Sequence, residues 1–242
     1  LVQFLQDNQW ITQSGLGSAE GGKEGVNLTK RGYSNWVPRW AMGGKAITWF
    51  SDRDGMKNHA SWGGEGDAYA MFLTQEAIDN FKLSKEDWEL KHAEEKEKKE
   101  KEEKEKKEKE EKEAEKNKDK KKDENKKKDE KKEDKKVEPL KIELDDIEKR
   151  KIRLTMHSTR LADAVLSKDG EKLFYLALFE KGFDLWVTEL RTKETKMHVK
   201  LGANNVGGMV MDTSGKTIYL IVDGSITKIG VEDGKREGVN IK

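Results

Sequence analysis

"AVLSKDGEKLFYLAL", residues 164–178, has apolar residues, then a turn that ends in Gly170, and then a run of β-forming residues. The pattern occurs twice more, as "PRWAMGGKAITWFSD" at residues 38–52 and as "MVMDTSGKTIYLIVD" at residues 209–223. A short glycine turn between two apolar runs is typical of a β-hairpin. The sequence therefore predicts three copies of one hairpin, with their turn glycines at Gly44, Gly170 and Gly215.

Further strands are predicted after each hairpin. A third strand fits "DAYAMFL" from Asp67, "DLWVTEL" from Asp184 and "SITKIGV" from Ser225, and a fourth fits "GKEGVNLT" from Gly22 and "GKREGVNIK" from Gly234. The turn glycines at 170 and 215 are 45 residues apart, a period typical of propeller blades. We therefore expect an all-β fold of four-stranded antiparallel β-propeller blades whose apolar faces stack side by side.

A highly charged tract interrupts the first of these blades. Residues 94–136 consist almost entirely of Asp, Glu and Lys, with 21 Lys against 19 acidic residues. Gly44 and Gly170 are 126 residues apart, where one period is about 45. About 80 extra residues therefore lie between the third strand near Asp67 and the fourth strand of that blade. The prediction is an insertion at a blade hairpin, covering residues 74–137.

The ends of this insertion carry helix signals. "TQEAIDNF" from Thr74 fits a short helix, and "SKEDWELKHAEEKEKKE" begins with Ser84 as an N-cap and has Asp87 three positions later, a variant of the capping box. Glu and Lys then recur four residues apart up to Lys112, and each such pair contributes a few tenths of a kcal/mol. We therefore expect a long charged α-helical insertion, fraying into disorder before Pro139, that acts as a solvated spacer.

Composition argues against several classes of partner. The formal net charge is +1 and the tract is nearly balanced, so no excess of cations is available to bind nucleic acid. Without cysteine there is no disulfide framework and no thiolate metal site. No apolar run approaches the roughly 18 residues that span a bilayer, so no membrane partner is predicted. The chain begins at Leu1 without a leader and is expected to be a piece of a longer protein.

Catalytic motifs are incomplete throughout. "GLGSAEGGKEG", residues 15–25, has the spacing of a phosphate loop, but Glu24 stands where a Ser or Thr would bind magnesium. The four histidines have no ligand spacing, and no G-x-S-x-G motif occurs. The sequence therefore predicts no catalytic residue, no cofactor and no metal site.

The glycine-rich stretch "NHASWGGEGDAYAMF", residues 58–72, is the best candidate for ligand contact. Binding residues concentrate on exposed loops, and this one carries His59, Trp62 and Glu65. The alternative is that Trp62 packs over the blade edge while the glycines allow a long hairpin to turn. His59, Trp62 and Glu65 are predicted as peptide-contact residues with that alternative open.

Two stretches resemble tricorn-like serine proteases, of the C-terminal-processing peptidase type. Residues 25–55 are similar to a junction between propeller blades in that family, with matches at Leu28, Thr29, Pro38, Trp40, Gly44 and Lys45. Ala41, Met42 and Gly43 replace the usual Ser-Pro-Asp of the turn. "PLKIELDDIEKRKIRLT", residues 139–155, resembles the segment that closes one propeller and leads to the next.

The resemblance implies a non-catalytic propeller region that gates or guides peptides to a C-terminal protease core, and nothing in this sequence matches that core. It implies that residues 1–155 end one propeller and residues 156–242 begin a second with two blades. The implied partners are peptides or unfolded polypeptide. Tricorn itself is a hexamer, so homo-oligomerisation of the full-length protein stays open. The implied compartment is the cytoplasm, or the periplasm if the full-length protein begins with a signal peptide.

Two other functions fit the same residues. A TolB-like propeller would be a stand-alone module that binds a protein partner without proteolysis. In the third interpretation the charged tract is the functional part and acts as a ruler that sets a distance, while the blades only hold it in place. A PDZ-like domain followed by a Ser nucleophile downstream would support the protease, and loss of function on deletion of residues 94–136 would support the ruler.

Overall fold

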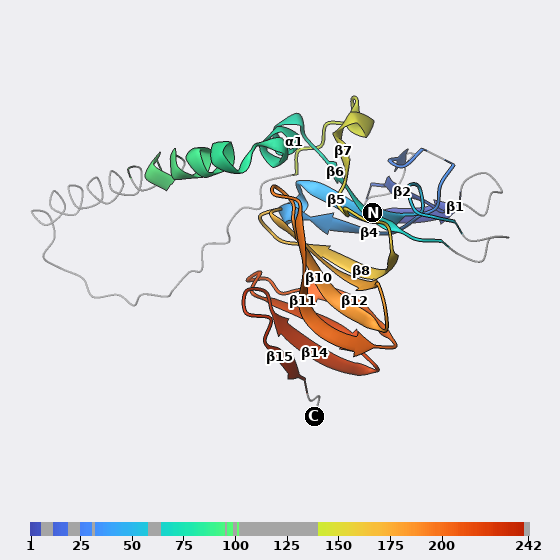
Figure 1. Cartoon of the computed structure of the whole chain (residues 1–242). Coiled ribbons are helices and arrows are strands. Elements are labelled where there is room, and N and C mark those ends of the chain that lie inside the picture. Colours follow the sequence, from blue (N-terminus) through green and yellow to red (C-terminus); the bar gives the residue numbers. More distant parts are fainter. Residues whose placement is uncertain are drawn as a thin grey trace, which may run out of the picture. The chain divides into compact units, whose positions relative to one another are not determined.

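The computed structural model describes residues 1–5, 12–18, 25–30, 32–57, 64–94, 96–98, 101 and 140–239 (Figure 1). The chain divides into two compact units. We call Leu1–Lys82 with Leu140–Lys242 the blade unit, and Leu83–Pro139 the insertion unit. Every strand described lies in the blade unit.

The blade unit contains four antiparallel sheets. The first has β1 (Val2–Leu5), β2 (Thr12–Leu16) and β3 (Val26–Asn27). The second has β4 (Asn35–Ala41), β5 (Ala46–Ser51), β6 (Asp67–Phe72) and β7 (Lys151–Arg153). The third has β8 (Arg160–Leu166), β9 (Lys172–Leu178), β10 (Phe183–Glu189) and β11 (Glu194–Ala203). The fourth has β12 (Val206–Met211), β13 (Thr217–Val222), β14 (Ser225–Gly230) and β15 (Arg236–Gly238).

In each sheet the strands are hydrogen-bonded in the order in which the chain forms them. In the second, third and fourth sheets this meander has four strands and is the predicted blade, with β6, β10 and β14 as the predicted third strands; three strands of the first sheet are described. The predicted fourth strands "GKEGVNLT" and "GKREGVNIK" contain β3 and β15. The prediction of four-stranded antiparallel sheets is therefore confirmed.

The three turn glycines occupy equivalent places. Each follows the first strand of its sheet with a positive φ: 91° at Gly44, 79° at Gly170 and 77° at Gly215. A Cβ added at Gly170 would lie 2.6 Å from Met42 Cε, and one added at Gly215 would lie 3.4 Å from Lys168 Cδ. Met42 and Lys168 each stand two residues before the turn glycine of the preceding sheet. The turn glycines of the third and fourth sheets therefore each lie against the equivalent residue in the turn of the preceding sheet.

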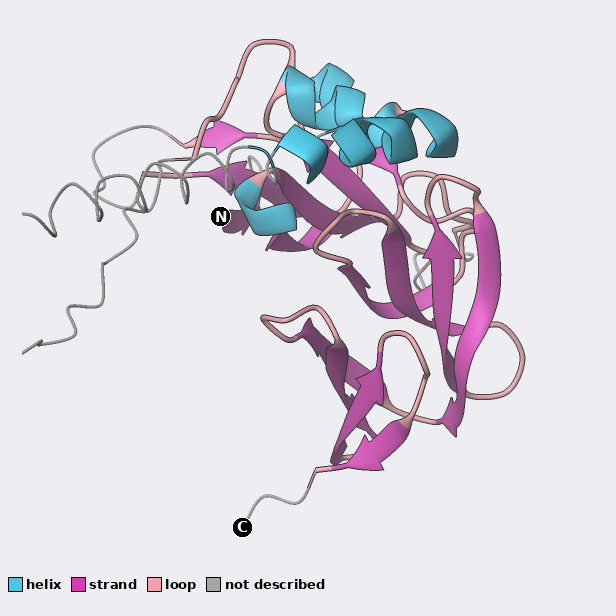
Figure 2. Cartoon of the chain, turned by 90° about the vertical axis from the view of Figure 1, so that its left-hand side faces the viewer, coloured by secondary structure: helices cyan, strands magenta, loops and turns pink. Residues whose placement is uncertain are grey.

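Consecutive four-stranded sheets lie side by side (Figure 2), and they share hydrophobic cores. Phe72 of β6 and Tyr175 of β9 belong to the core between the second and third sheets. Leu176 of β9 and Leu220 of β13 belong to the core between the third and fourth sheets. Because successive side chains on a strand point to opposite faces, β9 packs against both neighbouring sheets.

The first strands of three sheets are tied together by one buried carboxylate. Arg39 of β4 donates to both oxygens of Asp163 in β8, at 2.7 and 3.2 Å. The second oxygen also accepts the backbone N–H of Met209 in β12, at 2.7 Å. The predicted division into two propellers at Thr155 stays a prediction.

The insertion leaves the second sheet between β6 and β7, the hairpin at which it was predicted. Its described part is helical over α1 (Gln75–Lys82), residues 85–94, residues 96–98 and residue 101. The predicted cap is confirmed, because the Asp87 N–H donates to Ser84 Oγ at 3.1 Å. The long charged helix is not supported, and most of residues 94–136 lie outside the described residues.

The two segments of the blade unit that flank the insertion unit are hydrogen-bonded to the rest of the blade unit. Buried Arg150, in the 3-10 helix η3 (Ile147–Arg150), donates to the carbonyls of Phe72, Glu143 and Asp145. Glu143 accepts the first N–H of α1, from Gln75, at 2.9 Å. At the other end of α1, Arg191 donates to the carbonyls of Asn80 and Phe81 while it pairs with Glu171.

Among the described residues, no helix is both long enough and apolar enough to cross a membrane.

Candidate functional site

The loops of each blade lie at two opposite ends, because consecutive hairpins of a meander turn at alternate ends. One end of the second sheet carries the β5–β6 loop, residues 52–66, with the connections at 28–34 and 154–159. The opposite end carries the 3-10 helix η1 (Met42–Gly44) and the roots of the insertion. We call these the loop end and the insertion end.

A pocket opens near the loop end, between the residues that follow β3 and the second sheet. It is a shallow, open hollow with a cavity volume of about 10 Å³, enough for about one water molecule, and it is lined by Thr29, Tyr33, Asn35, Trp49, Ser51, Arg53, Tyr69 and Lys151. Its aromatic floor is formed by Trp49 of β5 and Tyr69 of β6, whose rings stack 5.8 Å apart at 17°. The two residues are direct partners in the β5–β6 register, so the sheet itself fixes the floor.

Polar groups fix the sides of this pocket. The Trp49 indole N–H donates to Asn35 Oδ1 at 2.9 Å, which holds the ring flat against the sheet. Thr29 accepts the Ser14 N–H and donates to Gln13 Oε1, which ties the pocket wall to the first sheet. The hydroxyl of Ser51, a buried residue, makes no side-chain hydrogen bond with any described residue. That hydroxyl is therefore available to a bound polar group.

The rim of the pocket is cationic and aromatic. Tyr33 lies half-buried, with Lys57 Nζ 5.0 Å and Arg53 Cζ 6.0 Å from its ring centroid. Cations at this distance are attracted to the face of an aromatic ring. Arg53 has only a loose ion pair, 3.8 Å from Asp54, and no hydrogen bond to any described residue. Its guanidinium can therefore turn toward a ligand at small cost.

Tyr69 also joins the pocket floor to the β5–β6 loop. Its hydroxyl donates a hydrogen bond to Asp54 Oδ2. Burial, and then this hydrogen bond, raise the pKa of Tyr69 well above its usual value. The phenol is therefore neutral at physiological pH and acts as a fixed donor, not as a base.

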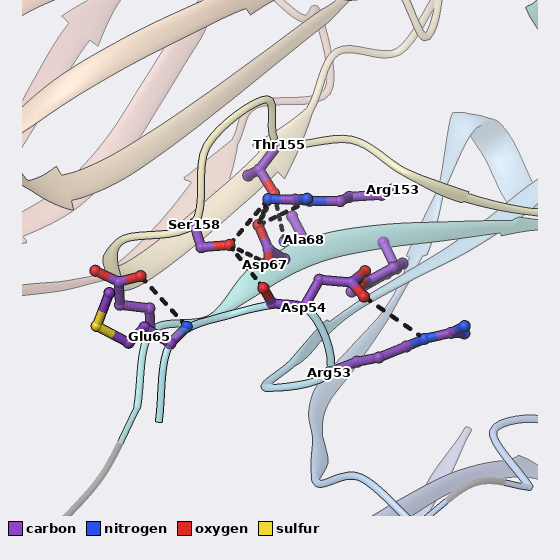
Figure 3. A network of polar contacts seen from close by, with 10 residues as sticks. Arg53, Asp54, Glu65, Asp67, Ala68, Arg153, Thr155 and Ser158 are labelled. Atoms are coloured by element: carbon purple, nitrogen blue, oxygen red, sulfur yellow. Dashed lines mark hydrogen bonds and ion pairs between the residues drawn. The ribbon is translucent and has the colours of Figure 1, made fainter. Parts of the chain in front are cut away.

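A second polar cluster holds the loop end together (Figure 3). Asp67, the fully buried first residue of β6, pairs with Arg153 at 2.8 Å. It also accepts the hydroxyl protons of Thr155 at 2.6 Å and Ser158 at 2.9 Å. Arg153 donates to Ser158 Oγ at 2.9 Å. These residues join β6 to the connection between the second and third sheets, and they leave Asp67 no free oxygen for chemistry.

The predicted contact residues fall only partly within the described chain. Glu65 is half-buried, and its carboxylate accepts the Met56 N–H at 3.4 Å across the base of the hairpin (Figure 3). His59 and Trp62 lie outside the described residues. Their role in peptide contact stays a prediction.

The sequence reasoning missed the pocket residues. Tyr33, Trp49, Arg53 and Tyr69 stood inside or beside predicted strands, where aromatic residues are usually assigned to the core. A usable signal was present, because aligning the predicted second and third strands as a hairpin places Trp49 opposite Tyr69.

The arrangement is suited to binding. Over the described residues, no three His, Asp or Glu side chains gather closely enough to hold a metal ion. Stacked rings, a free hydroxyl and a cationic rim are groups that offer packing contact and hydrogen bonds.

No protein-family description and no curated protein sequence matches this chain. Solved structures do. TolB from Acinetobacter baumannii is 10% identical, with a TM-score of 0.51 over 96% of this chain and 38% of TolB. The tricorn protease is also 10% identical, with a TM-score of 0.52 over 98% of this chain and 20% of the protease. The chain therefore spans well under half the length of either protein, and the likeness shows that its sheets have the β-propeller fold.

Proposed function

We propose that this chain is a non-catalytic propeller segment that binds extended peptides at its loop end. In this proposal it guides them to a peptidase core of the tricorn type, which the described residues do not form. The observation that carries the proposal is the pocket with its aromatic floor and cationic rim. A short unstructured peptide can place one side chain against Tyr33, above the Trp49–Tyr69 floor, of which only 3% and 4% is exposed, while its backbone meets Ser51 and Arg53.

The aromatic part of the pocket gives the proposal its energetic basis. Aromatic rings provide large contact area at low entropic cost, and interface hot spots are enriched in Trp, Tyr and Arg. All three residue types line this pocket. The floor is also fixed in advance by the sheet and by Asn35, so binding does not have to order it.

The test is a binding titration with short, unstructured, fluorescein-labelled peptides that carry aromatic, acidic or basic residues. Tyr33→Ala and Arg53→Ala should each weaken binding about tenfold, or about 1.4 kcal/mol, because each removes one side of the rim. Phe179→Ala is the matched control, since it removes an exposed aromatic from the third sheet. The proposal fails if no peptide binds, or if all three variants bind as the parent chain does.

A stand-alone interaction module is the second candidate, favoured by the similarity to TolB. The two functions differ in what accompanies the blades in the full-length protein. A PDZ-like domain followed by a Ser nucleophile supports the peptidase. Peptide binding without any such domain supports the module.

The charged tract is proposed to be a spacer. Deleting residues 94–136 should change peptide binding or processing by less than tenfold, because the pocket residues come from β5, β6 and the loop end, and only Lys151 directly follows an insertion root. A larger loss would favour the ruler hypothesis.

A further inference from the structure

The hydrogen-bond acceptors that line the pocket are already engaged within the protein. Asn35 Oδ1 accepts the Trp49 indole N–H at 2.9 Å, and Thr29 Oγ1 accepts the Ser14 backbone N–H at 2.9 Å. The Tyr33 carbonyl accepts the side-chain amide of Asn35 at 2.7 Å. A ligand that approaches as a hydrogen-bond donor therefore meets acceptors that already have donors.

The donors at the pocket are much less engaged. Arg53 makes no hydrogen bond to any described residue, and its ion pair with Asp54 is 3.8 Å long, beyond hydrogen-bonding distance (Figure 3). The distance from Lys57 Nζ to Asp52 Oδ2 is also 3.8 Å. The buried Ser51 hydroxyl makes no side-chain hydrogen bond with any described residue. A ligand group that accepts hydrogen bonds therefore fits the pocket better than one that donates them.

The charge of the lining residues favours an anionic acceptor. Arg53 and Lys151 are cationic, and none of the residues that line the pocket is acidic. The carboxylates of Asp52 and Asp54 belong to the adjoining β5–β6 loop, and each already accepts a hydrogen bond from the protein. An anionic group therefore meets positive charge in the pocket, although Asp54 partly offsets the charge of Arg53.

The size of the pocket restricts this anion to a small one. A cavity of about 10 Å³ holds about one water molecule, and one oxygen of a carboxylate has that size. That oxygen can enter and accept the Ser51 hydroxyl proton, while the second oxygen stays at the rim beside Arg53. Hydrogen bonds between a guanidinium and a carboxylate are charge-assisted, and they are about twice as strong as neutral ones.

We propose that the peptides bound at the loop end carry an internal Asp or Glu, whose side-chain carboxylate accepts hydrogen bonds from Ser51 and Arg53. This inference rests on the proposed peptide binding and names its substrate class. The side-chain carboxylate, and not a backbone carbonyl, meets these two donors, while the adjacent side chain of the peptide packs against Tyr33. The carboxylate is not that of a chain terminus, because termini are captured by clusters of backbone N–H groups, whereas the donors here are side chains.

The test compares three short peptides of Gly and Ser that contain Phe followed by Glu, Gln or Lys. All three are acetylated and amidated, so the Glu side chain is the only carboxylate among them. Isothermal titration calorimetry measures their binding to the whole chain without a charged label. The Glu peptide should bind about tenfold tighter than the Gln peptide, and the Lys peptide should bind most weakly.

Substitutions at Arg53 then test the source of this preference. Arg53→Gln should reduce the preference for Glu over Gln to less than about threefold, and Arg53→Glu should make the Lys peptide bind tighter than the Glu peptide. The matched control is Arg160→Gln in the third sheet. Arg160 Cζ lies 5.9 Å from the Phe183 ring centroid, much as Arg53 Cζ lies 6.0 Å from that of Tyr33. The control removes an equal charge from a similar contact and should leave the preference at about tenfold.

The inference is overturned if peptides bind but the Glu and Gln peptides bind equally, or if Arg53→Gln leaves the preference intact. The proposed peptide binding would survive both results. A Gln peptide with a free C-terminal carboxylate provides a further check, because binding as tight as that of the capped Glu peptide would mean that the terminus is recognised and would also overturn the inference. If no peptide binds, the proposed function fails and this inference fails with it.

Discussion

The third and fourth sheets have the same strand order and the same type of opening hairpin, yet they differ in how many faces are covered. Five consecutive residues of β9 are buried, whereas burial in β13 alternates. The two strands are similarly apolar, so the difference comes from their neighbours. The comparison teaches that an apolar side chain at the same position of the repeat contributes more to stability where a neighbouring sheet covers it than where no described residue does. The following predictions test that difference, from the largest effect to the smallest.

Phe174→Ala and Tyr219→Ala are the sharpest pair. Removing the buried Phe174 ring leaves a cavity between two sheets and should cost about 3–5 kcal/mol of unfolding free energy. Removing the partly exposed Tyr219 ring should cost less than about 1 kcal/mol. Urea denaturation of both variants measures the two values. Equal losses of unfolding free energy would show that coverage by a neighbouring sheet makes no difference at these two positions.

Asp163→Ala should have the next largest effect. The Asp163 carboxylate holds Arg39 and the Met209 N–H, so its loss leaves a buried donor unpaired and should cost about 2–3 kcal/mol. In the fourth sheet, Asp223 accepts two exposed loop N–H groups, and Asp223→Ala should cost about 1 kcal/mol or less. Thermal unfolding of the pair provides the check, and a costlier Asp223→Ala would contradict it.

Gly170→Ala and Gly215→Ala compare the two turns. Both have positive φ, which should cost an alanine about 1 kcal/mol. At Gly170 the new methyl group also meets Met42, so about 1–2 kcal/mol more is expected there. Gly170→Ala with Met42→Ala should recover the extra loss. No recovery would mean that Met42 does not set the contact between these turns.

Glu237 on β15 should give the smallest effect. Its exposed carboxylate pairs with Lys228 and Lys235, and these contacts lower its pKa to about 2. Because the folded-state pKa is depressed, the stabilisation is present above the unfolded value near 4.5 and is lost as the pH falls through about 2. An NMR titration of the Glu237 side chain follows this shift. A midpoint near 4.5 would show that the contacts are absent in solution.

The blades could be predicted because their signal is local. Each hairpin has its own glycine turn and apolar runs, and the recurrence at Gly170 and Gly215 gave the period that located the insertion. The helix start at Ser84 was equally local. The length of the charged helix could not be predicted from local signals, because weak Glu–Lys pairs alone do not determine how far a solvated helix extends.

The pocket could not be predicted in the same way. Its residues run from Thr29 to Lys151, on both sides of the insertion, and they meet only after three strands pair in the correct register. Reasoning from the sequence instead favoured the glycine-rich loop with Trp62. Tyr33 and Arg53 also lie in polar connecting segments. The aromatic floor beneath them forms only when β5 pairs with β6, so the sequence of those segments gave no sign of it.

The alternation of hairpins between two ends of the sheet has a consequence for how such a chain can vary. The second sheet carries roots of a long additional segment at one end and the rim of a pocket at the other, and β5 and β6 separate them. Of the residues that line the pocket, only Lys151 directly follows a root of the insertion, at the end of the 3-10 helix η3. If the pocket binds peptides as proposed, the length of the insertion and the ligand preference of the pocket can therefore change largely independently of each other.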